Sequence, residues 1–339
     1  MLSFFKKNDP YRIVGLILIL LITRVVFFLF FNEGLWALDV NESNLLETNT
    51  LHSGPLANLL FVGLASLNSQ FVDAFLAGIL ILLNGIQLNS IFIRNASLQE
   101  STYVPAAIYV ILLSASESFY HLSPELVGSS FLLIALNYLF YHIKYRGTEE
   151  NILSTGFTIG LAGLCYYPFV WVFLMVLTIY LLYSGTITRR YFLFAWGFFL
   201  PLLITWLIFF LLDRGGDFLD TLFIEPFNYQ VLGSLLNESV IVYGFTLLLS
   251  LIAAIQHFSG QGMTNHQILV QKAMSWVGFF GLLVIAVFGT EQLTSLVLII
   301  PAMAYFVTKL LSDLSKKYLA ELLFIGLFGI AIATMVLGY

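Results

Sequence analysis

Two carboxylates and a histidine are the first residues of the chain whose types and spacing suggest chemistry. Asp39 and Glu42 lie three residues apart, and His52 stands just before Gly54. Acids spaced in this way could take a proton from a hydroxyl group or supply oxygen ligands to Mg²⁺ or Mn²⁺. Exposed loops also carry acids for solubility alone, so the spacing leaves all three roles open.

Glu117 and His121 are a second candidate pair, four residues apart in a short segment between two apolar runs. Short connections at one end of a helical bundle lie close together, so either side chain could face Asp39. A histidine in such a place is also commonly a hydrogen-bonded structural residue. No two of the five histidines have HxxxH spacing, so the sequence predicts no transition-metal site. A divalent cation held by acids is the one cofactor left open.

Two arginines stand apart from the other basic residues. Arg24 lies inside an apolar run, where an arginine is costly and marks a candidate site. In a functional role, Arg24 would bind a lipid phosphate or an acid of the next loop. In a structural role, it would extend toward the lipid headgroups and bind one partner within the protein. Arg214 precedes Gly215 and Gly216, whose backbone can approach a ligand closely. Arg214 is therefore a candidate clamp for a phosphate, with a neighbouring aspartate as its alternative partner.

The elements that must position these residues are apolar. Of 339 residues, 60% are hydrophobic and 10% are charged, against about 25% charged in soluble domains. This composition excludes a cytosolic enzyme, a nucleic-acid-binding module and a secreted domain. Spanning helices need about 20 apolar residues. Eleven runs fit roughly: 13–31, 71–93, 103–117, 124–142, 152–165, 167–184, 192–212, 239–256, 273–289, 293–309 and 319–338.

The expected fold is therefore an all-α, polytopic transmembrane bundle of about eleven spans, forming a single membrane domain over 1–339. Residues 1–12 form a short N-terminal segment before the first span. Two outer loops are long, 32–70 and 213–238. The first contains an apolar segment after Pro55 that is too short to span, and we expect it to form a helix in the membrane interface.

Charge orients the bundle. With a cytoplasmic N-terminus, twelve of the fourteen basic residues fall on the inner side: Lys6, Lys7, Arg12, Arg94, Lys144, Arg146, Arg189, Arg190, Lys272, Lys309, Lys316 and Lys317. Thirteen of the nineteen acids fall outside: Glu33, Asp39, Glu42, Glu47, Asp73, Glu117, Glu125, Asp213, Asp217, Asp220, Glu225, Glu238 and Glu291. The pattern predicts a multi-pass membrane protein with its C-terminus on the outer side and lipids as its first partners.

Small and polar residues within the spans predict helix contacts. Gly156 and Gly160 match the spacing of close helix packing, and Gly163 lies on the same face. Asn84 and Gln87 form part of a polar patch, for which interhelical hydrogen bonding is expected. Few other ionisable groups lie inside the spans, which argues against an ion pathway.

The layout resembles the glycosyltransferase-C superfamily, polytopic enzymes that move sugars from polyprenyl-phosphate carriers. The similarity lies in Thr23-Arg24-Val25, in the first-loop acids Asp39 and Glu42, and in the short helix opened by Gly54, and it covers residues 12–215. The chain also resembles a family of uncharacterised inner-membrane proteins of Bacteroidota, which implies a multi-pass protein of a bacterial inner membrane with a periplasmic C-terminus. The first loop lacks an adjacent Asp-Glu or Asp-x-Asp pair, and no soluble outer domain is present.

The resemblance to the glycosyltransferase-C superfamily implies a transferase that uses a polyprenyl-phosphate-linked sugar at the periplasmic face. Asp39 would be the base or a metal ligand, with Glu42 beside it, and Glu117 would be the second-loop acid. Arg24 and Arg214 would bind the lipid phosphate. The alternative is a non-catalytic scaffold or partner subunit of a cell-envelope assembly complex. The sequence alone leaves the choice between enzyme and scaffold open, and it predicts no nucleic-acid partner because no basic block is present.

Overall fold

The computed structural model describes residues 1–6, 9–37, 53–65, 70–145, 148–184, 188–213, 215–216, 218, 239–256, 263–288, 294–314 and 316–337. Within these ranges every regular element is helical, and β-type pairing is limited to one bridge between Ser53 and Tyr166. The all-α fold class is confirmed. It suits apolar segments that must satisfy their own backbone groups, as helices do.

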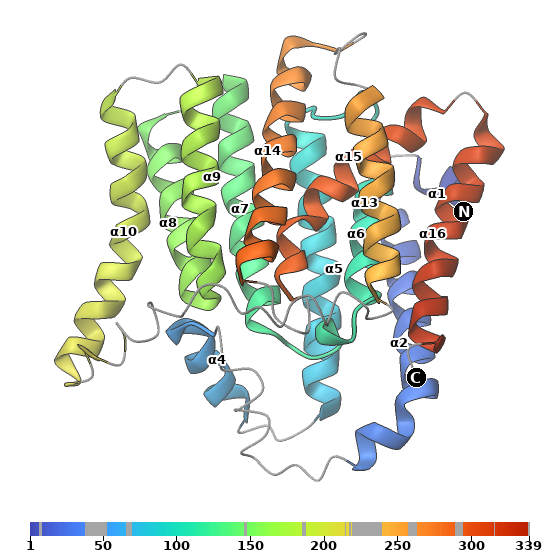
Figure 1. Cartoon of the computed structure of the whole chain (residues 1–339), viewed down its shortest axis with the longest axis horizontal. Coiled ribbons are helices and arrows are strands. Elements are labelled where there is room, and N and C mark those ends of the chain that lie inside the picture. The colour runs from blue at the N-terminus through green and yellow to red at the C-terminus, as the bar shows by residue number, and fades with distance from the viewer. Residues whose placement is uncertain are drawn as a thin grey trace.

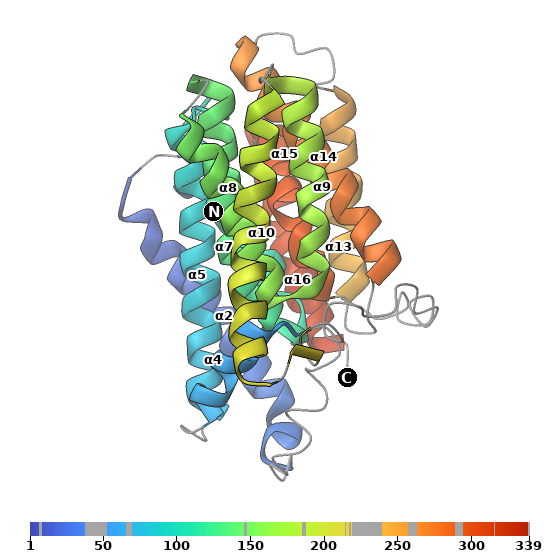
Figure 2. The ribbon, with the colours of Figure 1, turned by 90° about the vertical axis from the view of Figure 1, so that its left-hand side faces the viewer.

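The long helices run alternately up and down beside one another, so that neighbours in sequence are antiparallel (Figure 1). Turned by 90°, the same bundle shows α10 in front of α8 (Figure 2). The helices are α1 (Leu2–Phe5), α2 (Arg12–Ala37), α4 (Pro55–Ala65), α5 (Gln70–Arg94), α6 (Val104–Ser114), η1 (Glu117–Phe119), α7 (Pro124–Tyr145), α8 (Glu149–Cys165), η2 (Tyr167–Trp171), α9 (Val172–Ile179), η3 (Tyr180–Ser184), α10 (Thr188–Leu211), α13 (Ser239–Gln256), α14 (Asn265–Phe288), η4 (Thr294–Leu298), α15 (Ile300–Asp313) and α16 (Lys317–Leu337).

Six described helices are long and apolar enough to cross a membrane, which makes the chain compatible with a multi-pass membrane protein. They lie in α2, α5, α7, α10, α14 and α16. Other expected spans correspond to shorter apolar helices at Val104–Ser114, Tyr167–Tyr183 and Ile241–Gln256. The run 293–309 is divided between η4 and α15. Eleven crossings therefore stay a prediction.

The helix α6 is the centre of the bundle. All of its residues are buried, and it packs against α2, α5 and α15. Its 11 residues span about 16 Å at 1.5 Å per residue, roughly half of a hydrocarbon core. The chain on either side of so short a helix must be non-helical at membrane depth, and this is tolerated where protein surrounds it. The burial of α6 therefore explains why a short helix suffices here.

Glycines bring α8 and α10 into close contact, as their spacing predicts. A Cβ added at Gly156 would collide with the Phe194 carbonyl oxygen, and one at Gly160 would collide with Pro201. On the opposite helix, a Cβ at Gly197 would collide with the Leu153 carbonyl oxygen. Van der Waals packing and close backbone approach drive helix association in lipid, so these glycines fix the pair.

The short helix expected after Pro55 is present as α4. The Gly54 amide donates a hydrogen bond to the Cys165 carbonyl oxygen at 2.8 Å, at the tight turn between α8 and η2. An added Cβ at Gly54 would collide with the Leu164 carbonyl group, so only glycine allows this approach. Leu59 and Leu60 on α4 remain exposed, as expected for a helix that contacts lipid.

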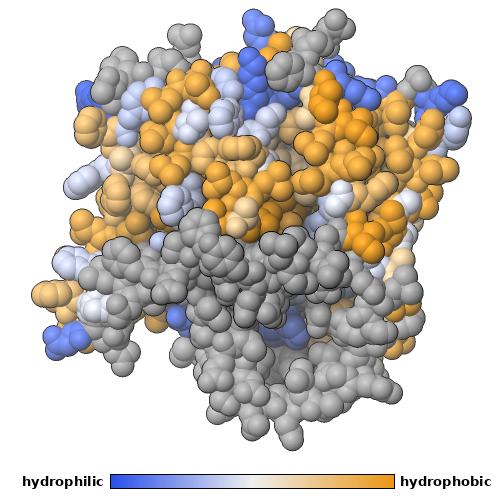
Figure 3. All heavy atoms as spheres, viewed as in Figure 1, coloured by the Kyte–Doolittle hydropathy of each residue, from blue (hydrophilic) through white to orange (hydrophobic). Residues whose placement is uncertain are grey.

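The two ends of the bundle differ in charge. Arg94 ends α5, Lys144 lies in the last turn of α7, and Lys317 begins α16. We name this the cation end; it lies at the top of Figure 1, and hydrophilic residues line the upper margin in Figure 3, above an apolar side. The opposite, acid end carries Asp73 and Glu125 in the first turns of α5 and α7.

Candidate functional site

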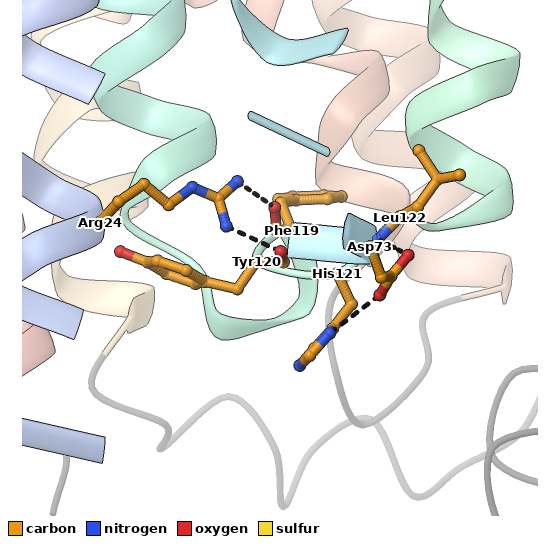
Figure 4. A network of polar contacts seen from close by, with 6 residues as sticks. All are labelled: Arg24, Asp73, Phe119, Tyr120, His121 and Leu122. Atoms are coloured by element: carbon orange, nitrogen blue, oxygen red, sulfur yellow. Dashed lines mark hydrogen bonds and ion pairs between the residues drawn. The ribbon is translucent and has the colours of Figure 1, made fainter. Parts of the chain in front are cut away.

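At the acid end, Arg24 of α2 holds the connection between α6 and α7. Its Nη1 donates to the Tyr120 carbonyl oxygen at 2.7 Å, and its Nη2 donates to the Phe119 carbonyl oxygen at 3.1 Å (Figure 4). The guanidinium also lies 4.5 Å from the centre of the Tyr120 ring. The planar fork of arginine suits two neighbouring acceptors, so a single residue closes the turn that follows η1.

Tyr120 is the buried centre of this corner. Its ring stacks on Phe27 of α2 with 3.5 Å between ring centroids and 12° between planes. Its hydroxyl lies 3.2 Å from the Thr23 carbonyl oxygen and 3.1 Å from that of Ser114. Burial raises the pKa of Tyr120, and the charge of Arg24 opposes that rise. The hydroxyl is therefore a neutral donor that joins α2 to the end of α6.

The next residue, His121, pairs with Asp73 in the first turn of α5. Its Nδ1 lies 3.0 Å from Asp73 Oδ2, while the Leu122 amide donates to Asp73 Oδ1 at 3.2 Å. Both carboxylate oxygens thus have a partner. The side chains keep 41% (His121) and 37% (Asp73) of their surface exposed. Figure 4 shows that the His121 ring points away from the arginine, with its second nitrogen turned from Asp73.

The structure brings two of the predicted site residues, Arg24 and His121, into one network. Glu117 begins η1 in the same connection, but its side chain lies outside the described part of the chain. The remaining candidates also lie outside it: Asp39, Glu42, His52 and Arg214. The roles predicted for these residues stay predictions.

Sequence reasoning placed Asp73 on the outer side but did not pair it with a histidine. The prediction that Glu117 or His121 could face Asp39 stays a prediction, because Asp39 and the Glu117 side chain lie outside the described part of the chain; within that part, His121 pairs with Asp73. One signal was present: Asp73 follows the start of a span and His121 precedes the start of another, at the same predicted end. Tyr120 gave no such signal, because its role depends on burial.

Among the described residues, no group of three or more histidine, cysteine, aspartate or glutamate side chains could hold a metal ion. Asp73 and His121 supply two such side chains, already bonded to each other. Their arrangement can exchange a proton, or present one imidazole nitrogen to an outside group.

The polar patch inside the bundle is structural. Asn84 of α5 donates to Ser129 Oγ at 3.0 Å and accepts from Ser130 Oγ at 2.8 Å, which joins α5 to α7 as predicted. Beside it is a cavity of about 30 Å³, lined by Tyr109, Ser129 and mainly apolar side chains. This volume is about one water molecule and far below that of ligand pockets, so no sugar fits there.

Comparison with known proteins adds no relative: no family model, curated protein or solved structure matches this chain.

Proposed function

We propose that the protein is a multi-pass membrane transferase of glycosyltransferase-C-like layout, which moves a sugar from polyprenyl phosphate at the acid end of the bundle. One observation carries the proposal. One network at the acid end joins three separate segments of the chain through Arg24, Asp73 and His121. The helix α4 and the last turns of α2 lie at the same end. The loop with the predicted acids Asp39 and Glu42 connects those two helices.

In this proposal the acid end supplies a base and a cation for phosphate. Asp39, or another proton acceptor close to it, takes the proton of the acceptor hydroxyl. Arg214 binds the lipid phosphate, whose negative charge increases as it leaves the sugar. Charge stabilisation of this leaving group is the main catalytic effect expected, as in other group transfers.

The test compares single variants in cells. Asp39→Asn and Glu117→Gln remove one negative charge each with little change in volume, and we expect either variant to abolish the envelope glycan that depends on this protein. Mass spectrometry of the glycans, with protein level measured by detergent gel filtration, gives the readout. Unchanged glycans at normal protein level would remove the enzymatic proposal.

Sidedness is tested separately, because the proposal needs Asp39 and Lys144 on opposite faces of the membrane. Cysteines introduced singly at the two positions should differ in labelling by an impermeant thiol reagent on intact cells. The only native cysteine, Cys165, is buried, so background labelling should be low. Equal labelling at both positions would contradict the orientation.

A scaffold in a cell-envelope assembly complex is the second candidate, and one observation favours it. Both terminal nitrogens of Arg24 are bonded to backbone carbonyl oxygens, so this arginine stabilises the fold whether or not it binds phosphate. A scaffold would tolerate Asp39→Asn and would purify with a stoichiometric partner from native membranes. Loss of the glycan in Asp39→Asn without such a partner would contradict it.

A further inference from the structure

We propose that His121, oriented by Asp73, is the proton acceptor of the acid end. The reaction that His121 would serve is the one given by the proposed function, so that part of the inference rests on it. The acid–base role of the pair rests on geometry alone. The resemblance to known transferases made Asp39 the base or a metal ligand. The inference gives the base to His121 and leaves Asp39 and Glu117 as the acids of the site, so the losses expected above for Asp39→Asn and Glu117→Gln are unchanged.

The hydrogen bond between the two side chains sets which nitrogen is free. An ionised Asp73 accepts a hydrogen bond from Nδ1, so the neutral imidazole carries its proton there and has its lone pair on Nε2. A carboxylate held in this way also stabilises the imidazolium that forms when Nε2 takes a proton. The pair therefore has the arrangement that a general base needs.

The surrounding contacts keep this geometry fixed. The Leu122 amide holds the second oxygen of Asp73, so the carboxylate cannot turn away from the ring. Arg24 holds the carbonyl oxygens of the two residues before His121. Because the backbone is fixed on both sides of His121, Arg24 acts on the base as a positioning residue, through the chain and without touching the imidazole.

Exposure separates His121 from the other described histidines. His142 is 1% exposed, and His266 uses Nε2 for a 2.7 Å hydrogen bond to the Asn95 carbonyl oxygen. Of the three histidines whose surroundings the structure describes, only His121 pairs with a carboxylate, and 41% of its side chain is accessible. It can therefore meet a substrate at the end of the bundle.

The proposed step balances as follows. The acceptor hydroxyl gives its proton to His121 Nε2, and its oxygen forms a bond to the anomeric carbon of the sugar. The bond between that carbon and the phosphate oxygen breaks, and polyprenyl phosphate leaves with the electron pair. The imidazolium then returns its proton to water, so the products are a glycoside, polyprenyl phosphate and one proton.

The first experiment uses the purified full chain with short polyprenyl-phosphate hexoses that carry a radiolabelled hexose. We expect His121→Ala to lower turnover about 100-fold or more, and added imidazole to restore about tenfold, since general-base effects are of order 10²–10⁴. Asp73→Asn should lose about 10- to 100-fold through the misoriented ring. The matched control is Glu149→Gln, which removes a carboxylate paired with Arg189 at the cation end and should keep normal turnover.

Full turnover of His121→Ala, in protein with a wild-type gel-filtration profile, would overturn the inference. Loss of turnover without rescue by imidazole would also count against it, because a purely structural histidine gives that result. Failure of the wild-type protein to turn over any of the hexose probes would count against the proposed function, and the second experiment then decides the inference alone.

That second experiment measures the imidazole without a substrate. Diethyl pyrocarbonate reacts with unprotonated imidazole nitrogens, and peptide mass spectrometry resolves each histidine. We expect fast modification at His121 and protection of the buried His142. At a pH high enough for the imidazole to be unprotonated in both proteins, Asp73→Asn should slow the His121 reaction several-fold, because Nε2 loses the carboxylate that increases its basicity, whereas Glu149→Gln should leave the rate unchanged. Equal His121 rates in the wild type and Asp73→Asn would overturn the inference.

Discussion

At the cation end, three side chains from α7 and α14 bind the turn after α5, whereas at the acid end one arginine binds the turn before α7. Lys144 Nζ lies 3.1 Å from the Arg94 carbonyl oxygen, and His266 Nε2 lies 2.7 Å from that of Asn95. Gln267 Nε2 reaches the carbonyl oxygens of Ala96 at 3.4 Å and Leu98 at 3.2 Å. Ala96 has a φ of 48°, so these contacts also hold a backbone conformation that alanine rarely adopts.

The difference shows how each end uses its polar groups. At the cation end the contacts are divided among several side chains, and each binds backbone that would otherwise lack partners. At the acid end Arg24 satisfies two carbonyl oxygens, and the adjacent His121 and Asp73 are half-exposed; among the described residues, their hydrogen bonds stay within this corner. At the cation end the polar side chains bind the backbone of the turn. At the acid end two polar side chains, those of Asp73 and His121, face outward.

The largest effect is expected for Arg24→Leu. It would leave two buried carbonyl oxygens without a donor, at about 1–3 kcal/mol each, so we expect a loss near 3 kcal/mol after relief of the buried charge. Arg24→Lys keeps the charge but cannot bind both oxygens at once, so it should lose about half as much. Unfolding in mixed micelles measures both variants. Wild-type stability of Arg24→Leu would show that the turn is held by other contacts.

Gly54→Ala comes next and tests how α4 is held at the acid end. The added methyl group would collide with the Leu164 carbonyl group and weaken the bond from Gly54 to Cys165, for an expected loss of about 2 kcal/mol. Gly244→Ala is the matched control. No atom lies within 4 Å of a Cβ there, so alanine should stabilise α13 by about 0.4–1 kcal/mol. Equal behaviour of the two variants would contradict the close approach of α4.

Gln267→Ala tests the division of contacts at the cation end. The variant removes three bonds of 3.1 Å or longer, two donated to Ala96 and Leu98 and one accepted from the Thr264 amide, while Lys144 and His266 remain in place. We expect a loss of about 1.5 kcal/mol, below that of Arg24→Leu, because these bonds are long and each neutral hydrogen bond contributes only about 0.5–1.5 kcal/mol net. The same unfolding assay measures it. A loss equal to that of Arg24→Leu would remove the contrast between the two ends.

Local patterns in the sequence predicted the features that depend on neighbouring residues. The position of α4 followed from Pro55 at a helix start, and a close helix contact at Gly156 and Gly160 followed from their spacing, although the spacing did not name α10 as the partner. The hydrogen bonds of Asn84 followed from the cost of polar groups in an apolar helix.

The partners in the candidate site could not be predicted in the same way. Arg24 binds backbone carbonyl oxygens 95 and 96 residues away, and every residue has such a group, so no residue type marks the partner. The pairing of His121 with Asp73 depends on how α5 and the connection before α7 meet in space. Charge counting placed both residues at one end but could not set the distance between them.

The smallest effect is expected for Arg189→Gln at the cation end. Arg189 lies 3.5 Å from Glu149, and the side chains are 76% and 48% exposed. Water screens such a pair, so we expect a change within about 0.5 kcal/mol, and less at high salt. Glu149→Gln should have the same small effect. A loss above about 1 kcal/mol in either variant would show that exposed pairs stabilise the cation end, and the outward-facing Asp73 and His121 would then need no function to explain them.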